Sequence, residues 1–251
     1  MTMTSYKALM LDLDGTTIPN ALKAVPSKRV ITAIHNAQQK IAVCVVTGRS
    51  LQEAAPILDI LQITKPTVLM GGSQIVDGIS QKVIYKKPLA KNDIQEIINL
   101  LSQYPIDISI REATKTKSYR QGYPFIETYG ITAMNIPMAL ADELTNKISH
   151  LPNVTAHKVL SWTHKEYVLL NISHVNATKQ YAIFEVAKLL GVATHEIIGI
   201  GDGHNDFPLL MACGLKVAIG NAVPELKAIA DYIAPSVDDD GVAAVIDKFI
   251  M

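Results

Sequence analysis

The chain alternates between short apolar runs and longer segments with helical periodicity. Six runs of strand length stop at a glycine or a polar residue, at residues 7–12, 41–48, 67–72, 196–202, 216–221 and, more weakly, 232–234. Because these runs are apolar on both faces, they predict buried parallel strands rather than strands with one wet face. The pattern therefore favours a sheet that is covered on both sides.

Helical patterns fill the intervals between these runs. One apolar stripe follows Ser27, a second segment spans 51–61 after a Ser50 cap, and a third repeats from Ala182 until Gly191, a residue suited to end a helix. Alternation of strand and helix is typical of the α/β class. We therefore predict a doubly wound, Rossmann-like parallel sheet as the core of the fold.

The middle of the chain breaks this rhythm. Between residues 81 and 175, strands with polar alternation accompany two helical segments, near 92–103 and 138–150. This mixture predicts a separate α+β unit inserted into the α/β core. The expected division is a core domain of residues 1–80 and 176–251 and an inserted domain of residues 81–175.

Composition and charge describe an ordinary globular protein. Of 251 residues, 49% are hydrophobic, and 23 basic residues balance 23 acidic ones, which gives no reason to expect nucleic acid as a partner. No apolar run approaches the roughly 20 residues that span a bilayer, and Cys44 and Cys213 lack metal-ligand spacing. We expect a cytoplasmic, unanchored protein with reduced thiols.

Polar and glycine residues follow the predicted strands where ligands bind in parallel sheets, beyond the carboxyl ends. They are Asp12, Asp14, Gly15, Thr47, Gly48, Arg49, Gly71, Gly72, Ser73, Asp202, Gly203, His204, Asn205 and Asp206. Carboxylates from two distant segments suit a hard cation, and Mg²⁺ prefers carboxylates, water and a substrate phosphate. The sequence therefore predicts a magnesium site, without a Cys or His cluster that would favour zinc.

Each of these motifs also has a purely structural interpretation. The "DLDG" segment can be a turn, although it lacks the later ligands of a calcium loop, and "GDGHND" can be a glycine turn with a helix cap. Lys179 can begin a solvated helix face, and His204 is expected to be an ordinary loop residue. Only the coincidence of the motifs at strand ends favours a functional site.

Four motifs, in order, resemble those of the haloacid dehalogenase superfamily of phosphotransferases. They are the Asp-x-Asp-Gly-Thr segment at residues 12–16, Thr47 in "VVTGR", Lys179 at the start of a helix, and Gly-Asp-Gly-x-Asn-Asp at residues 201–206. The position of the insertion resembles the C2-type cap of the Cof-type branch. Gln180 and the segment 17–19 depart from the usual pattern, at positions that affect loop shape.

The resemblance implies a role for each motif residue. Asp12 would attack phosphorus and form an aspartyl-phosphate, and Asp14 would protonate the leaving oxygen and then deprotonate water. The carboxylates of Asp12 and Asp202, with the backbone carbonyl of Asp14, would hold Mg²⁺. The expected contacts to phosphate and substrate come from Thr47, Lys179, Asn205, Gly48, Arg49, Thr16 and the amides near Gly15. Asp206 would orient a metal-bound water or Lys179.

The inserted unit is expected to contribute to substrate choice. Its stretch 111–123 could contact an anionic or sugar leaving group, or it could form only a solvated hairpin. The residues concerned are Arg111, Lys115, Lys117, Tyr119, Arg120 and Tyr123. Trp162 and His164 could also line the cleft that binds the substrate. Three functions stay open: a phosphatase of small phosphate monoesters such as sugar phosphates, a phosphomutase of the phosphomannomutase type, and a non-catalytic module that binds a phosphorylated metabolite. The oligomeric state is not predicted.

Overall fold

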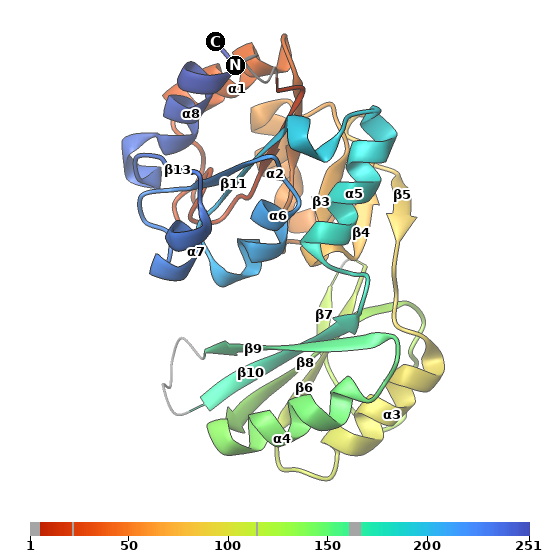
Figure 1. Cartoon of the computed structure of the whole chain (residues 1–251). Helices are drawn as coiled ribbons and strands as arrows, with labels where there is room; N and C mark the ends of the chain where they lie inside the picture. The colour runs from red at the N-terminus through yellow and green to blue at the C-terminus, as the bar shows by residue number, and fades with distance from the viewer. Residues whose placement is uncertain (1–5, 22, 114, 161–166) are drawn as a thin grey trace. The chain divides into compact units, whose positions relative to one another are not determined.

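The computed structural model describes residues 6–21, 23–113, 115–160 and 167–251. The chain forms two compact units (Figure 1). Unit 1 takes in the chain up to Tyr85 and again from Thr178, and unit 2 is Lys86–Ala177. The structure thus places residues 81–85 in unit 1, although the sequence assigns them to the insertion. The physical reason is strand pairing, because β5 (Val83–Lys86) is the outer strand of a small sheet with β4 (Gln74–Val76).

Unit 1 contains the predicted parallel sheet, with the strand order β13-β12-β11-β1-β2. Its strands are β1 (Ala8–Leu11), β2 (Ala42–Val45), β11 (Ile197–Gly201), β12 (Leu215–Ala218) and β13 (Tyr232–Ile233). A parallel bridge from Val46 to Val68 places β3 (Thr67–Leu69) beside β2. The chain runs outward from β1 in both directions, so the strand order reverses next to β1, where ligands bind in such sheets.

Helices flank this sheet as the doubly wound class requires. They are α1 (Lys28–Gln38), α2 (Leu51–Leu61), α5 (Lys179–Leu190), α6 (Phe207–Met211), α7 (Pro224–Ile229) and α8 (Gly241–Phe249). Helix α1 packs beside α8, and α5 packs beside α6 (Figure 1). The Ser50–Glu53 capping box begins α2, and left-handed Gly191 ends α5. The predicted fold class is confirmed.

Unit 2 is an antiparallel sheet with two helices on one face. The strand order is β7-β6-β8-β10-β9, formed by β6 (Asp107–Glu112), β7 (Thr116–Ser118), β8 (Thr128–Pro137), β9 (Val154–Leu160) and β10 (Tyr167–His174). Helices α3 (Lys91–Leu101) and α4 (Met138–Ser149) bury side chains such as Ile97 and Leu144 in one apolar cluster with the sheet. This unit has its own core and matches the predicted α+β character.

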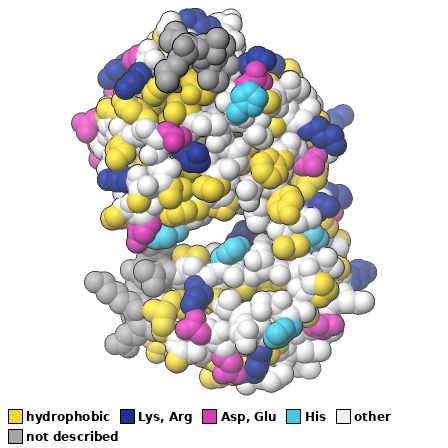
Figure 2. Space-filling view, viewed as in Figure 1, with side chains coloured by type: hydrophobic (Ala, Val, Ile, Leu, Met, Phe, Trp, Pro, Cys, Tyr) yellow, Lys and Arg dark blue, Asp and Glu magenta, His cyan; other side chains and the backbone are white. Residues whose placement is uncertain are grey.

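The surface shows no grouping of one charge on the face drawn in Figure 2. Basic and acidic side chains are interspersed there among uncharged ones. This distribution agrees with the equal totals of 23 basic and 23 acidic residues. Among the described residues, no helix has both the length and the apolar composition needed to cross a membrane.

Candidate active site

The carboxyl ends of the unit 1 strands bring together residues that are far apart in the sequence. Asp12 follows β1, Thr47 follows β2 and Asp202 follows β11, while Lys179 is the first residue of α5. Asp12 and Lys179 are each only 3% exposed, and Thr47 is fully buried. Charged side chains are rarely this buried without a partner, so their contacts determine what the site can do.

A buried lysine bridges two aspartates at the centre of the site. Lys179 Nζ donates to Asp12 Oδ1 at 2.5 Å and to Asp206 Oδ1 at 2.6 Å. Burial lowers the pKa of Lys179, but the charges of Asp12 and Asp206 outweigh this effect and raise it, so the amine stays charged. The pKa of Asp12 is raised by burial and by the charge of Asp206, with Lys179 acting in the opposite direction.

The second oxygen of Asp206 shapes the turn that carries Asp202. Asp206 Oδ2 accepts from the backbone N–H groups of Asp202 and Gly203, each at 3.0 Å. Asp206 therefore holds Lys179 with one oxygen and the Gly-Asp-Gly turn with the other. This geometry supports the role of an orienting residue that the resemblance implies for Asp206.

A glycine allows the start of α5 to approach this centre. Gly72 has φ +110°, and a Cβ atom placed on it would lie 2.2 Å from the carbonyl oxygen of Thr178. The Thr178 side chain accepts from Tyr181 N at 3.3 Å and caps α5. Close backbone contact at Gly72 thus fixes the first turn of the helix, and with it the lysine that follows the cap.

Three carboxylates form a cluster that suits a divalent cation. Asp12, Asp202 and Asp206 each offer an oxygen, and these atoms lie within 4.8 Å of one another. Burial, followed by the charge of Asp206, raises the pKa of Asp202 to about 6. All the donors are carboxylate oxygens, which fits Mg²⁺. Because both oxygens of Asp206 already accept hydrogen bonds, Asp12 and Asp202 are the better ligands; the Asp14 carbonyl as a third ligand stays a prediction.

Gly15 and Thr16 support Asp202 in this structure, and a phosphate contact for these two residues stays a prediction. The Gly15 amide donates to Ile18 O at 2.8 Å, and Thr16 Oγ1 donates to Asp202 Oδ1 at 3.0 Å. Gly15 has φ +80°, and a Cβ atom there would lie 2.4 Å from Asp202 Oδ2. The loop closes on itself, and its backbone is pressed against Asp202.

The predicted residues after β2 separate into two kinds. Thr47 Oγ1 accepts from the Arg49 amide at 3.2 Å, whereas Gly48 is exposed and has open space where a side chain would lie. Arg49 makes a bidentate contact with Asp14, from Nε to Oδ2 at 2.9 Å and from Nη2 to Oδ1 at 2.5 Å. The sequence predicts acid and base chemistry for Asp14 and substrate binding for Arg49, and neither role predicts this ion pair.

Asn205 and His204 lie at the exposed rim of the site. A Cβ atom on Gly203 would be 2.6 Å from Asn205 Oδ1, so the amide folds back over the turn. His204 Nε2 lies 3.8 Å from Glu225 Oε2, and its ring stacks on Phe207 with centroids 6.2 Å apart. These outward contacts agree with the view of His204 as a loop residue, while a phosphate contact for Asn205 stays a prediction.

Two supporting residues escaped the sequence analysis. Thr17 Oγ1 donates to the backbone oxygen of Asp12 at 2.6 Å, and Asn221 Nδ2 donates to the backbone oxygen of Gly15 at 2.7 Å. Asn221 also ends the fifth apolar run, so the rule that polar groups at strand ends build the site could have found it. Thr17 is 2% exposed and carries no comparable sequence signal.

In unit 2, the polar stretch 111–123 contains an ion pair and a hydrogen bond between its own side chains. Tyr123 OH donates to Glu112 Oε1 at 2.6 Å, and Lys117 Nζ lies 3.5 Å from Glu112 Oε2 and 5.6 Å from the centre of the Tyr123 ring. Tyr119 stacks on Phe125. These contacts favour a solvated hairpin over side chains that bind the leaving group of a substrate. Trp162 and His164 lie outside the described residues.

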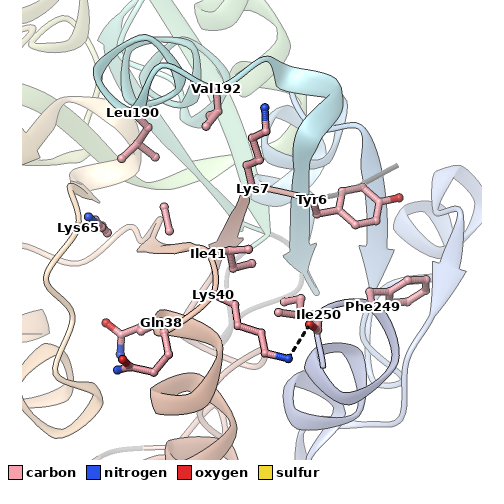
Figure 3. Close-up of a pocket in the computed structure, with 12 residues that line it drawn as sticks. Tyr6, Lys7, Gln38, Lys40, Ile41, Lys65, Leu190, Val192, Phe249 and Ile250 are labelled. Atoms are coloured by element: carbon pink, nitrogen blue, oxygen red, sulfur yellow. Dashed lines mark hydrogen bonds between the residues drawn. The ribbon is translucent and has the colours of Figure 1, made fainter. Parts of the chain in front are cut away.

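A cavity of about 710 Å³ lies at the opposite ends of the unit 1 strands (Figure 3). Lys7 and Ile41, which precede β1 and β2, line it together with Lys40 and Phe249. Helices α1, α5 and α8 end there, so their carbonyl groups face the cavity region. This end of a parallel sheet is not where such folds bind ligands, and the cavity contains none of the predicted site residues.

Comparison with known proteins agrees with this geometry. The sequence model of the haloacid dehalogenase-like hydrolases matches residues 9–138 and 130–246. The chain therefore belongs to the haloacid dehalogenase-like hydrolase family, and the predicted family is confirmed. Its enzyme class is that of the hydrolases, and the prediction of a phosphoric monoester hydrolase agrees with relatives that are named as phosphatases.

Individual relatives extend over almost the whole chain. A 5-amino-6-(5-phospho-D-ribitylamino)uracil phosphatase of Bacillus subtilis is 25% identical over 252 residues, which cover 98% of this chain and 96% of that protein. A solved phosphatase of the same superfamily from Bacteroides thetaiotaomicron has a TM-score of 0.84 at 20% identity and covers 99% of this chain and 96% of its own. A subclass IIB sugar phosphatase has a TM-score of 0.78 at 21% identity, and the match covers 97% of this chain and 98% of that protein.

Proposed function

We propose that this protein is a Mg²⁺-dependent phosphatase that hydrolyses small phosphate monoesters, with sugar phosphates or related metabolites as the substrate class. The observation that supports it most strongly is the buried contact of Asp12 with Lys179, beside Asp202. A carboxylate that is kept buried next to a fixed cation is suited to attack an anionic phosphate, because its own charge and that of the substrate are both offset.

The proposed reaction gives each side chain the role that the resemblance implies. Asp12 attacks phosphorus, the bond to the leaving oxygen breaks, and Asp14 gives a proton to that oxygen. Water then attacks the aspartyl-phosphate and passes a proton to Asp14, and the bond from Asp12 to phosphorus breaks. Lys179 and Thr47 stabilise the phosphoryl oxygens during both transfers. A bound Mg²⁺, held by Asp12 and Asp202, would neutralise phosphate charge at the site.

The sheet of unit 2 carries a row of uncharged polar side chains. Ser109, Thr132, Asn171 and His157 stand opposite one another on the neighbouring strands β6, β8, β10 and β9. Their neighbours along each strand, such as Ile110 and Leu170, point into the apolar cluster under α3 and α4. Because side chains alternate along a strand, this row lies on the opposite face of the sheet, away from the two helices. Thr132 Oγ1 already donates to Asn171 Oδ1 at 2.9 Å.

The chemistry of this row suits hydroxyl groups. Burial lowers the pKa of His157, which favours the neutral imidazole, and the other three side chains carry no charge. Hydroxyl, amide and imidazole groups both donate and accept hydrogen bonds, as sugar hydroxyls do. The names of two relatives, a sugar phosphatase and a phosphatase of a phosphoribityl compound, point to the same substrate class.

We further infer a reducing, cytoplasmic setting. Cys44 and Cys213 are both free and buried, and burial raises the pKa of each thiol, which keeps them protonated and unreactive. Neither thiol takes part in the reaction proposed above.

Phosphate release from a panel of phosphorylated sugars, polyols and nucleotides tests the proposal. The wild-type protein should release phosphate with Mg²⁺ and stop when the metal is chelated, and Asp12→Asn should be inactive under both conditions. Full activity in the presence of chelator would contradict the metal requirement. Full activity of Asp12→Asn would contradict the nucleophile, and release from nucleotides alone would contradict the substrate class.

A further inference from the structure

The guanidinium of Arg49 is committed to Asp14 through two parallel contacts. Its Nε lies 2.9 Å from Asp14 Oδ2, and its Nη2 lies 2.5 Å from Asp14 Oδ1. A fork of this kind fixes both the distance and the plane of a carboxylate, which a single charge cannot do. The orientation of the Asp14 carboxylate is therefore set by a residue that lies 35 positions away in the sequence.

Arg49 is itself fixed to the loop that carries Thr47. Its third side-chain nitrogen, Nη1, donates to the Glu53 backbone oxygen at 3.4 Å, and its amide donates to Thr47 Oγ1 at 3.2 Å. Its carbonyl oxygen accepts from Met70 N at 2.9 Å. Each of the three guanidinium nitrogens therefore has a partner inside unit 1, and three of the five N–H groups are used in these contacts.

Exposure limits what this pair contributes to stability. The side chains of Arg49 and Asp14 are 24% and 37% exposed, and exposed ion pairs contribute about 1 kcal/mol or less to the free energy of unfolding, with bidentate pairs toward the upper end of that range. The same exposure leaves the Asp14 carboxylate accessible to a molecule at the site. A well-oriented but accessible carboxylate is what proton exchange with a bound molecule requires.

We propose that Arg49 is a positioning residue, which holds the Asp14 carboxylate where it exchanges protons with the leaving oxygen and with water, and that it is not a ligand of the transferring phosphate. This inference rests on the proposed function, since Asp14 matters as an acid and base only if the protein transfers phosphoryl groups. It replaces the substrate-binding role expected for Arg49.

The leaving group provides the test. An alkyl phosphate expels an alkoxide that needs a proton, whereas p-nitrophenyl phosphate expels a stable phenolate that does not. The value of kcat/KM reports the steps up to departure of the leaving group. Arg49→Met should lower kcat/KM for the alkyl ester by about 100-fold, through kcat, and change it less than about threefold for the aryl ester. Arg49→Lys keeps the positive charge but cannot make the bidentate contact, so its kcat/KM for the alkyl ester should lie between those of the wild type and Arg49→Met.

Arg29→Met is the matched control, because it removes an exposed pair with Asp247, at 3.2 Å, between α1 and α8. It should leave both esters unaffected. The thermal midpoints of Arg49→Met and Arg29→Met should lie within about 4 °C of the wild type. A much larger drop for Arg49→Met, with equal losses on both esters, would show a structural role and overturn the proposal.

A double-mutant cycle separates positioning from phosphate binding. If Arg49 acts through Asp14, then Arg49→Met should cause no further loss of alkyl ester turnover in the Asp14→Asn background. Additive losses, or an equal rise of KM for both esters, would make Arg49 a phosphate ligand and overturn the inference. If the wild-type protein with Mg²⁺ hydrolyses neither ester, it is the proposed function that fails, and this result is distinct from the others.

Discussion

Gly15→Ala should disable the site while leaving the fold intact. Gly15 has φ +80°, and a Cβ atom on it would lie 2.4 Å from Asp202 Oδ2 and 2.9 Å from Asp202 Cγ. The left-handed backbone costs an alanine about 1–2 kcal/mol in the free energy of unfolding. The contact adds a second effect, because the Asp202 carboxylate has to move by about 1 Å to reach ordinary van der Waals distance, and a shift of that size lowers a reaction rate by about 100-fold.

Gly191→Ala separates these two effects. Gly191 ends α5 with φ +67°, but a Cβ atom there would have nothing within 4 Å. Both variants should lose about 1–2 kcal/mol of stability in urea unfolding. Only Gly15→Ala should also lose about 100-fold in kcat/KM for p-nitrophenyl phosphate and bind Mg²⁺ more weakly. If the two variants keep similar activity, the argument that Gly15 holds Asp202 in place is wrong.

Three further predictions concern the charges around Asp202. Lys179→Met leaves Asp12 and Asp206 buried without their cation, so we expect a loss of about 3–5 kcal/mol in the free energy of unfolding. An unchanged free energy of unfolding in a urea titration would contradict the buried network of Lys179 with the two aspartates. Thr16→Val removes a hydrogen bond to Asp202 and should weaken Mg²⁺ binding roughly tenfold, as measured by calorimetry. An unchanged Mg²⁺ affinity would mean that this hydrogen bond does not orient the Asp202 carboxylate. Burial raises the pKa of Asp202 to about 6. Because the folded protein holds this proton more tightly than the unfolded chain, the stability from Asp202 is present at pH below its ordinary pKa and is lost as pH rises through about 6. Mg²⁺ should therefore stabilise the protein strongly at pH 8 and weakly at pH 5 in thermal unfolding, and a pH-independent shift would contradict a cation at Asp202.

The sequence predicts the scaffold of the site well because buried parallel strands have a distinctive pattern. Runs such as residues 41–48 are apolar on both faces, and the residue that ends each run reaches the same edge of the sheet. This rule is enough to place Asp12, Thr47 and Asp202 in one site. It does not require knowledge of how the side chains pair.

Contacts within the site are less predictable because they depend on distances between loops. Nothing local in the sequence indicates that Thr16 donates to Asp202, 186 positions away, or that Arg49 pairs with Asp14. The sequence predicts that amides near Gly15 face a phosphate, but it gives no sign that the Gly15 amide itself donates to Ile18. Strand β7 (Thr116–Ser118) is exposed along its whole length, so it lacks the apolar alternation by which strands are predicted.

The most direct test of the proposed mechanism is to trap the phosphoryl group on the protein. Wild-type protein with Mg²⁺ is mixed with excess p-nitrophenyl phosphate, quenched in acid within a single turnover, and digested for mass spectrometry. We predict one phosphoryl group on the peptide that contains Asp12, and none in the Asp12→Asn variant. A phosphoryl group on another residue, or nitrophenol release by the wild type with no phosphorylated peptide at any quench time, would contradict Asp12 as the nucleophile.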